Sequence, residues 1–421
     1  MAASSEPTTR IAPLGALRFR DFRLLWIGQL ISVFGSQMRI VAVDYQVYDL
    51  ARRSGAIDPA LALGFIGLAR VIALVLVAPL SGLLADRFER RMMLILTSFV
   101  ALFTSAVLAM ATQLGITSVW LIYAMVLMAA VAGAFEMPAR QAIIPGLVPA
   151  EFLPNALSIN IIAWQLATVI GPSLAGYLIA TTSLALVYWL DAASFVAVVI
   201  AATLMTRQEV KVPTRKASFS EALEGLRFVF KSPMIASTMV LDFFATFFGA
   251  SRALMPLFAA EVLHVGVVEL GWMYSAPAVG AVIAAGLMSM ITFRRQGPIL
   301  LIAVGLFGMF VALFAISTWL PLTLLALAGT GAADTISMVI RGTIRQLMTP
   351  DELRGRMVAV NMVFFAGGPQ LGEFQVGVLA SIIGGPLAVL IGGVLCVTFV
   401  AATAWKVPQL RQYDGPELTK P

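Results

Sequence analysis

The chain has 421 residues, of which 60% are hydrophobic and only 12% are charged, and its mean hydropathy is +0.93. A soluble domain carries about 25% charged residues because its surface faces water, so this composition excludes an ordinary soluble fold. The net charge of +6 does not indicate a nucleic-acid partner, because the basic residues lie between long apolar segments. We therefore expect an all-α protein embedded in a lipid bilayer, with no nucleic-acid partner.

Cysteine and histidine are scarce in this chain. Cys396 is the only cysteine, so an intramolecular disulfide cannot form. His264 is the only histidine, which argues against a histidine-based metal cluster. The first twenty residues lack the apolar core of a cleavable signal peptide. We expect a monomer that uses no cofactor and no metal.

Twelve apolar segments follow one another along the chain. A helix of about 20 apolar residues crosses ~30 Å of hydrocarbon at a rise of 1.5 Å per residue. The expected spans are 22–48, 60–84, 92–113, 117–137, 155–180, 184–205, 234–262, 268–292, 298–318, 320–343, 357–383 and 386–405. We therefore expect twelve transmembrane helices in two bundles of six.

The expected domain boundaries follow from these spans. An N-terminal segment (1–21) precedes the first bundle (22–205), and a central loop (206–233) connects it to the second bundle (234–405). A tail (406–421) ends the chain.

The distribution of Lys and Arg predicts the orientation of the helices. An even number of spans puts both termini on one side, and basic residues concentrate on the cytoplasmic side of membrane proteins. Most of the 28 Lys and Arg residues fall in segments that are cytoplasmic if the N-terminus is inside. Arg341 and Arg345 are counted among these cytoplasmic residues. We therefore expect both termini in the cytoplasm.

The central loop contains an expected amphipathic helix from Ser218 to Lys231. Ser218 and Glu221 form a capping box at its start. Four apolar residues share one face of this helix: Phe219, Leu223, Leu226 and Phe230. The pattern favours a helix that rests on the lipid headgroups, with a docking site for a partner as the alternative.

The two halves of the chain resemble each other in sequence. At a shift of 201 residues, six identities fall in one register. The matched pairs are Arg140 and Arg341, Pro149 and Pro350, Glu151 and Glu352, Asn160 and Asn361, Gly171 and Gly372, and Gly176 and Gly377. Because each half has an even number of spans, the repeats run parallel and are related by a pseudo-two-fold axis along the membrane normal. Such symmetry is typical of carriers whose two bundles rock around a central site, which is alternating access.

A polar motif ends the second span. It contains a small residue, an acidic–basic pair and a basic pair: Gly82, Asp86, Arg87, Arg90 and Arg91. Gly82 lets helices approach closely, and Asp86 can sit against the positive N-terminal end of a facing helix. The motif resembles the loop between helices two and three of the major facilitator superfamily. The resemblance implies a contact with span eleven that latches the cytoplasmic gate, and a loop without a gating role is the alternative.

A second motif lies in span five, where Gly171, Pro172 and Gly176 occur in the sequence Gly-Pro-Ser-Leu-Ala-Gly. Small residues around a proline allow close packing between bundles and a local bend. The motif resembles the Gly-Pro motif of exporters in the superfamily. The resemblance implies export rather than import, whereas packing alone is the alternative interpretation.

Further segments narrow the resemblance. They are Arg18–Trp26, Pro138–Ala142, Lys231–Pro233 and Leu353–Arg356. Together they resemble the bacterial enterobactin-exporter group, also called transmembrane secretion effectors, from Leu17 to Trp405. The resemblance implies a multi-pass protein of the bacterial inner membrane that exports a siderophore or a hydrophobic drug-like small molecule, with protons as the coupling ion.

Ionisable residues inside the spans are the candidates for function, since each costs about 2.5–3.5 kcal/mol at a helix centre. We expect seven of them to be proton-coupling or substrate-cavity residues: Arg39, Asp44, Arg70, Asp242, Arg252, Asp334 and Glu373. An eighth, Asp191, lies in span six. Counting along the helices puts Asp242 and Asp334 at one depth, where two carboxylates suit a proton carrier. The alternative is that all these residues form neutralised structural pairs.

Four phenylalanines crowd span seven: Phe243, Phe244, Phe247 and Phe248. They could stack on an aromatic substrate or serve packing alone.

Other functions are disfavoured by the same residues. An enzyme acting on lipids would need a positioned nucleophile, an acid–base pair or a metal site at the interface, and the sequence has no such constellation. A primary pump would need a Gly-Lys-Ser/Thr phosphate loop, which is absent. An importer of a small organic solute remains the alternative within the transporter class.

Overall fold

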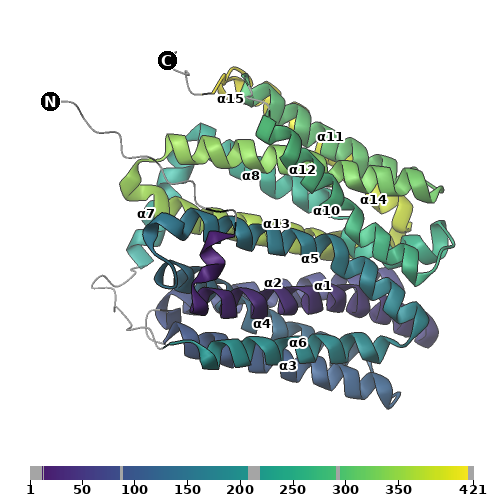
Figure 1. Cartoon of the computed structure of the whole chain (residues 1–421). Coiled ribbons are helices and arrows are strands. Elements are labelled where there is room, and N and C mark those ends of the chain that lie inside the picture. Colours follow the sequence, from purple (N-terminus) through teal and green to yellow (C-terminus); the bar gives the residue numbers. More distant parts are fainter. Residues whose placement is uncertain (1–11, 13, 86–88, 207–218, 291–293, 416–421) are drawn as a thin grey trace.

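The structure is a computed structural model that describes residues 12, 14–85, 89–206, 219–290 and 294–415. Throughout these residues the ordered elements are helices (Figure 1). The long helices of the first half are α1 (Arg20–Ser54), α2 (Pro59–Ala85), α3 (Arg90–Gln113), α4 (Val119–Ile143), α5 (Leu153–Thr181) and α6 (Leu184–Leu204). The second half contains α7 (Phe219–Lys231), α8 (Pro233–Phe248), α10 (Val267–Met290), α11 (Gln296–Ile316), α12 (Leu320–Met348), α13 (Asp351–Ile383) and α14 (Gly385–Lys406). Short elements are η1 (Gly15–Arg18), η2 (Ile144–Gly146), η3 (Ala150–Phe152), η4 (Arg252–Leu254), α9 (Met255–Leu257), η5 (Phe258–Val262) and α15 (Pro408–Arg411).

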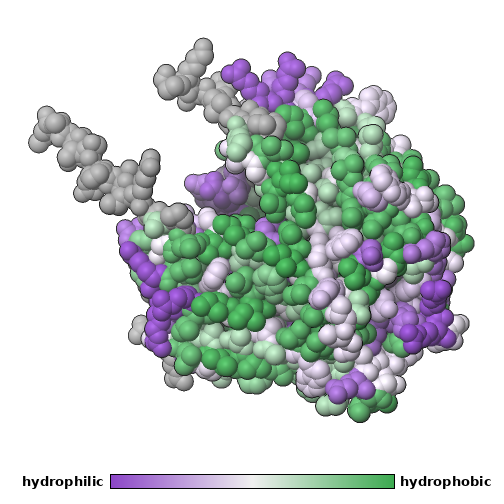
Figure 2. All heavy atoms as spheres, turned by 45° about the vertical axis from the view of Figure 1, so that its right-hand side comes forward, coloured by the Kyte–Doolittle hydropathy of each residue, from purple (hydrophilic) through white to green (hydrophobic). Residues whose placement is uncertain are grey.

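The twelve expected spans are confirmed. Within the described ranges, 11 helical segments are long and apolar enough to cross a membrane. The twelfth span, α13, has 33 residues, but Asn361, Gln370 and Glu373 interrupt its apolar character. At 1.5 Å per residue it is about 50 Å long, more than enough to cross the hydrocarbon. On the face shown in Figure 2, apolar side chains form a broad green surface, as a lipid-facing belt requires.

The helices form two bundles that lie side by side (Figure 1). In the first bundle α1 packs against α5 and α6, and α3 packs against α4 and α6. In the second, α12 packs against α10 and α11, and α14 packs against α11. We call the end where α1 begins and α14 ends the terminal end, and the opposite one, where α1 ends at Ser54, the far end. Two seams join the bundles, α2 against α13 and α5 against α10.

Glycines of the sequence repeat lie in these two seams. A Cβ added to Gly176 of α5 would come within 3.2 Å of the Gly271 Cα in α10, and within 2.5 Å of the Val267 carbonyl oxygen. A Cβ added to Gly377 of α13 would come within 2.6 Å of the Gly64 Cα in α2. Side chains would force the helices apart, so glycine is what allows this close approach. Both contacts lie toward the far end, where the bundles are held together.

The seventh span is interrupted, whereas a continuous helix over 234–262 was expected. Helix α8 ends at Phe248, and after the turn Gly249–Ser251 the chain continues through η4, α9 and η5. Pro256, in the first turn of α9, prevents a regular helix over residues 252–256, because proline lacks an N–H and its ring clashes with the carbonyl four residues earlier, that of Arg252. The interruption places the Arg252 side chain beside a gap in the helix.

The amphipathic helix of the central loop is present as α7. Its Val229 packs with Ile235 of α8 and Met357 of α13, while Leu226 and Phe230 are exposed. The Arg356 guanidinium contacts the Glu224 carboxylate at 2.6 Å, which ties α7 to α13. Exposed apolar residues on a helix at the end of a bundle fit a position on the lipid headgroups. Ser218 lies outside the described residues.

The close packing of α10 against α12 in the second bundle leads to a prediction about stability. A Cβ at Gly280 of α10 would lie 1.8 Å from the Ala328 carbonyl oxygen of α12, whereas a Cβ at Gly286 of the same helix meets nothing within 4 Å. Gly280→Ala is therefore expected to destabilise the protein by about 1–3 kcal/mol through overpacking. Gly286→Ala should leave stability unchanged or raise it slightly, because alanine favours a helix. Thermal unfolding in detergent measures both, and equal melting temperatures would contradict the prediction.

Candidate functional site

Most charged groups inside the helices are paired. Within the first bundle, the Arg39 guanidinium of α1 contacts the Asp191 carboxylate of α6 at 2.9 Å. Ser105 of α3 donates a hydrogen bond to the same carboxylate at 2.5 Å. Asp191 is completely buried, and its partners belong to its own bundle. This pair, together with the Ser105 hydrogen bond, holds α1, α3 and α6 together within the first bundle.

A second pair crosses between the bundles. The Arg70 guanidinium of α2 contacts the Glu373 carboxylate of α13 at 3.1 Å. A Cβ at Gly67, one turn from Arg70, would lie 2.8 Å from the Glu373 Cβ, so glycine makes room for this side chain. The ion pair therefore spans the α2–α13 seam and must break or move if the bundles separate there.

Asp44 is held differently. Its carboxylate accepts a hydrogen bond of 2.6 Å from the Tyr274 hydroxyl, which connects α1 to α10 across the bundles. The other buried carboxylates of the described helices, Asp191, Asp242 and Glu373, each have an arginine within 4.0 Å. Among these buried acids of the described helices, Asp44 alone has a neutral hydroxyl as its contact and no arginine within 4.0 Å.

Asp242 and Asp334 share one arginine. The Arg341 guanidinium of α12 lies 2.8 Å from the Asp242 carboxylate of α8 and 3.3 Å from that of Asp334. Arg345 lies 4.0 Å from Asp242 and donates a short hydrogen bond to Asn361 of α13. The two acids are therefore close, as the depth counting predicted, but a cation lies between them.

This cluster corrects one expectation. Arg341 and Arg345 were counted as cytoplasmic loop residues, yet α12 extends to Met348 and buries both guanidinium groups. Arg341 is 1% exposed, the largest of the fully buried side chains. The missed signal is a continuous helical pattern that runs past residue 343 to the Thr-Pro boundary at Thr349, where proline disfavours further helix in the residue before it.

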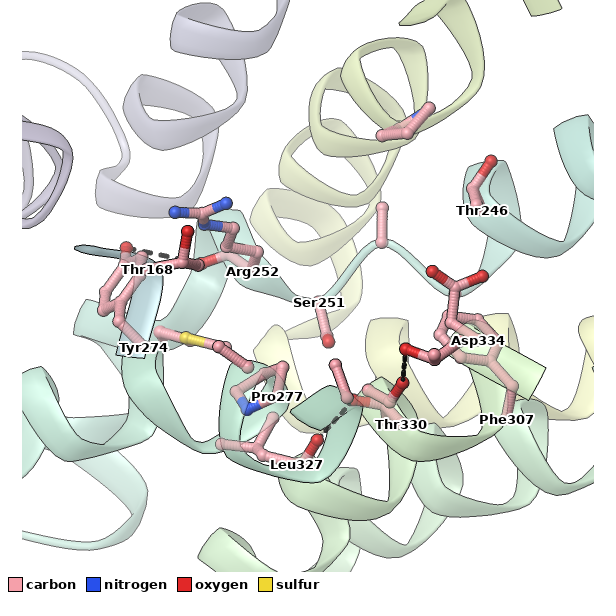
Figure 3. Close-up of a pocket in the computed structure, with 18 of the residues that line it drawn as sticks. Thr168, Thr246, Ser251, Arg252, Tyr274, Pro277, Phe307, Leu327, Thr330 and Asp334 are labelled. Atoms are coloured by element: carbon pink, nitrogen blue, oxygen red, sulfur yellow. Dashed lines mark hydrogen bonds between the residues drawn. The ribbon is translucent and has the colours of Figure 1, made fainter. Parts of the chain in front are cut away.

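A cavity of about 390 Å³ lies beside the break in the seventh span. Its lining comes mainly from the second bundle, with Gln165 and Thr168 contributed by α5. Figure 3 shows Arg252, Thr168 and Tyr274 on one side of it and Asp334, Thr246 and Phe307 on the other. The cavity therefore brings together three of the predicted residues, Arg252, Asp334 and Glu373. A space of this size with an apolar wall and few polar groups suits a small organic ligand.

The four phenylalanines of span seven serve packing. Phe243 stacks on Phe247 with ring centroids 5.9 Å apart, and Phe244 lies 4.7 Å from the ring of Phe399 in α14. None of the four is among the residues that line the cavity. The alternative of internal packing is the one that the geometry favours.

The gate motif is only partly described. Gly82 lies in α2, whereas Asp86 and Arg87 lie outside the described residues. Arg90 donates a hydrogen bond to the Ala142 carbonyl at 2.6 Å, and Arg91 donates one to the Thr203 carbonyl at 2.7 Å. Both bonds tie the start of α3 to neighbouring helix ends of its own bundle, where a cation is favourable.

The Gly-Pro motif lies in the α5–α10 seam. A Cβ at Gly271 would lie 2.6 Å from the Pro172 carbonyl oxygen, and a Cβ at Gly171 would lie 2.8 Å from the Gln37 Cβ of α1. Next to Pro172, Ser173 shares a hydrogen bond of 2.8 Å with Ser275 of α10. The motif thus forms an interface between the bundles, as its small residues predicted.

Two six-helix bundles, polar groups buried along the seams and a cavity beside them define a membrane transporter with the major facilitator fold. The chain belongs to the transmembrane secretion effector family, whose model matches residues 9–419. It is a multi-pass membrane protein and a transporter rather than an enzyme.

Similar proteins agree with this assignment. The enterobactin exporter EntS of Salmonella typhi is 29% identical over 344 residues, covering 80% of each chain. The multidrug efflux pump Tap of Mycolicibacterium fortuitum is 26% identical over 415 residues, covering 93% of this chain and 96% of its own. A bacterial homologue of the human lysosomal transporter Spinster, solved in an inward-facing and unoccupied conformation, has the same fold, with a TM-score of 0.74 at 14% identity. It covers 95% of this chain, and 99% of its own length is matched.

Proposed function

We propose that this transporter exports a siderophore or a hydrophobic drug-like molecule across the bacterial inner membrane in exchange for protons. Export is supported by the efflux relatives and by the Gly-Pro motif in the α5–α10 seam. The positive residues near the terminal end support a cytoplasmic location for both termini. A cavity of about 390 Å³ supports a small-molecule substrate.

The contacts between the bundles support alternating access. Tyr48 of α1 donates a hydrogen bond of 2.8 Å to Glu261 near the end of η5, and the Gly64–Gly377 and Gly176–Gly271 contacts lie in the same half of the molecule. With the far end closed in this way, a solute would enter the cavity from the terminal end. Release on the other side requires these contacts to separate and the bundles to close at the terminal end.

The Asp44–Tyr274 hydrogen bond is the observation on which proton coupling depends. Asp44 is buried at the seam, and its described contact is a neutral hydroxyl on the opposite bundle. A proton on this carboxyl would remove a buried charge that no arginine contacts, and would change the hydrogen bond that joins α1 to α10. Proton binding and separation of the bundles would thereby involve the same two side chains.

Transport into inside-out membrane vesicles tests the function. Vesicles with the protein should accumulate at least one of ethidium, a macrolide or a catechol siderophore when their interior is acidified. Addition of a protonophore should abolish the accumulation, and vesicles without the protein give the background. Accumulation confined to right-side-out vesicles would identify an importer and contradict the proposal.

A further inference from the structure

Arg252 differs from the other arginines inside the described helices. Arg39, Arg70 and Arg341 each contact a carboxylate within 3.1 Å. Arg252 has no such ion pair with a described residue, and its guanidinium donates no hydrogen bond to one. Its side chain is exposed where the break in the seventh span opens onto the cavity. A cation in this setting is available to a ligand.

The ring of Tyr274 lies against the Arg252 guanidinium but takes up none of its hydrogen-bond donors. The carbon of the guanidinium lies 5.4 Å from the centroid of the tyrosine ring, within the range of a cation–π contact. The Tyr274 hydroxyl is already committed to Asp44 at 2.6 Å. Among the described contacts Asp44 makes no ion pair with Arg252, so the N–H donors of the guanidinium remain available to an acceptor in the cavity.

Each acid that lines the cavity has an arginine partner. Asp334 contacts Arg341 at 3.3 Å and Glu373 contacts Arg70 at 3.1 Å. Neither arginine lines the cavity, and of the described lining residues Arg252 alone is cationic. The cation that the described lining offers to a ligand beside the break is therefore Arg252.

The rest of the lining suits a molecule with one polar end. Ser251, next to Arg252 in the chain, and Gln165 of α5 also line the cavity and offer a hydroxyl and an amide. Pro277, Phe307 and Leu327 provide apolar surface. A planar guanidinium with paired N–H donors matches a carboxylate better than a single-point acceptor.

We propose that Arg252 is the head-group subsite of the cavity and binds the carboxylate of an amphipathic organic acid, whose apolar body lies against Pro277 and Phe307. The inference rests on the proposed function, because it names the chemistry of a solute that the exporter would carry. Binding itself requires no proton gradient, so the subsite can be tested apart from transport.

Binding of two matched probes tests the subsite. Purified protein in phosphatidylcholine nanodiscs is titrated with 1-naphthoate and with its neutral amide, 1-naphthamide, by calorimetry. The wild type should bind naphthoate at least about tenfold more tightly than naphthamide, as expected for a charge-assisted hydrogen bond. Arg252→Gln should abolish this difference, and Arg252→Lys should keep part of it because the charge remains.

Control variants make the result specific. Arg53→Gln removes an arginine that is 76% exposed at the far end of α1, and it should bind naphthoate as the wild type does. Thermal unfolding of each variant shows whether it is folded. If Arg252→Gln does not fold, Arg252→Lys replaces it and should show a reduced preference for naphthoate. Equal binding of the two probes to the wild type, or undiminished naphthoate binding by Arg252→Gln, would overturn the inference.

The vesicle assay separates this inference from the proposed function. If the vesicles show gradient-driven export but the purified protein binds naphthoate and naphthamide equally, the exporter function stands and the subsite is overturned. If the purified protein prefers naphthoate in a way that depends on Arg252 but the vesicles show no gradient-driven export, the subsite is supported and the exporter function is contradicted.

Discussion

Asp44→Asn is expected to abolish gradient-driven transport while solute exchange across the membrane continues. Asparagine keeps the size of the side chain and an oxygen that can accept the hydrogen bond from Tyr274, which is 2.6 Å long in the wild type. It cannot carry a proton, so the coupling step is lost. In proteoliposomes, uphill transport under an acid gradient should fall to the level of liposomes without protein, whereas counterflow of solute without a gradient should persist.

Asp49→Asn is the matched control for this experiment. Asp49 lies on the same helix, is 31% exposed and pairs with Arg53 one turn away. Surface ion pairs of this kind contribute about 0–1 kcal/mol, so this variant should transport as the wild type does. Uphill transport by Asp44→Asn at the wild-type rate would exclude Asp44 as the proton carrier and would return attention to Asp334 and Glu373.

Arg341→Met is expected to destabilise the protein by about 3–5 kcal/mol, the range measured when one partner of a buried ion pair is removed. The change leaves Asp242, which is 2% exposed, without the guanidinium at 2.8 Å. Arg345, at 4.0 Å, lies too far for full compensation. Thermal unfolding in detergent and the yield of folded protein should both fall sharply.

A double variant separates the loss of the pair from the loss of packing. Arg341→Met with Asp242→Asn removes the unpaired charge, so it should recover a large part of the lost stability. Arg354→Met is the control, because Arg354 pairs with the exposed Asp351 and should matter by less than about 1 kcal/mol. If the single variant were as stable as the control, Asp242 would not need Arg341 and the cluster would not hold α8 to α12.

The sequence repeat predicted which helix positions are equivalent, but it did not predict which acids the equivalent arginines contact. Arg140 and Arg341 occupy equivalent positions, but Arg140 pairs with Glu136 on its own helix. Ser337 stands where a counterpart of Glu136 would be, so Arg341 reaches Asp242 on α8 instead. Identical residues at a fixed shift show which backbone positions of the two halves are equivalent. The partner of a buried charge depends instead on which acids the neighbouring helix offers.

For two glycines, by contrast, equivalent positions in the repeat do make equivalent contacts. Gly176 and Gly377 were matched in the repeat, and each lies in a seam between the bundles. A glycine in an apolar helix signals a close backbone approach to some other helix, and symmetry says that the two approaches are equivalent. The identity of the facing residues, Gly271 and Gly64, became known only from the packing of the helices.

The sequence by itself determined the membrane location, the twelve helices, the two related halves and the choice of candidate charged residues. These features are local: an apolar run of sufficient length must be helical in lipid, and a charge within it must be hidden. Only the tertiary structure decided that Arg39 pairs with Asp191, that Arg341 lies between two acids, and that the break after Phe248 exposes Arg252 to a cavity. Pairing depends on the rotation and depth of each helix relative to its neighbours, and those are set by packing across residues far apart in the chain.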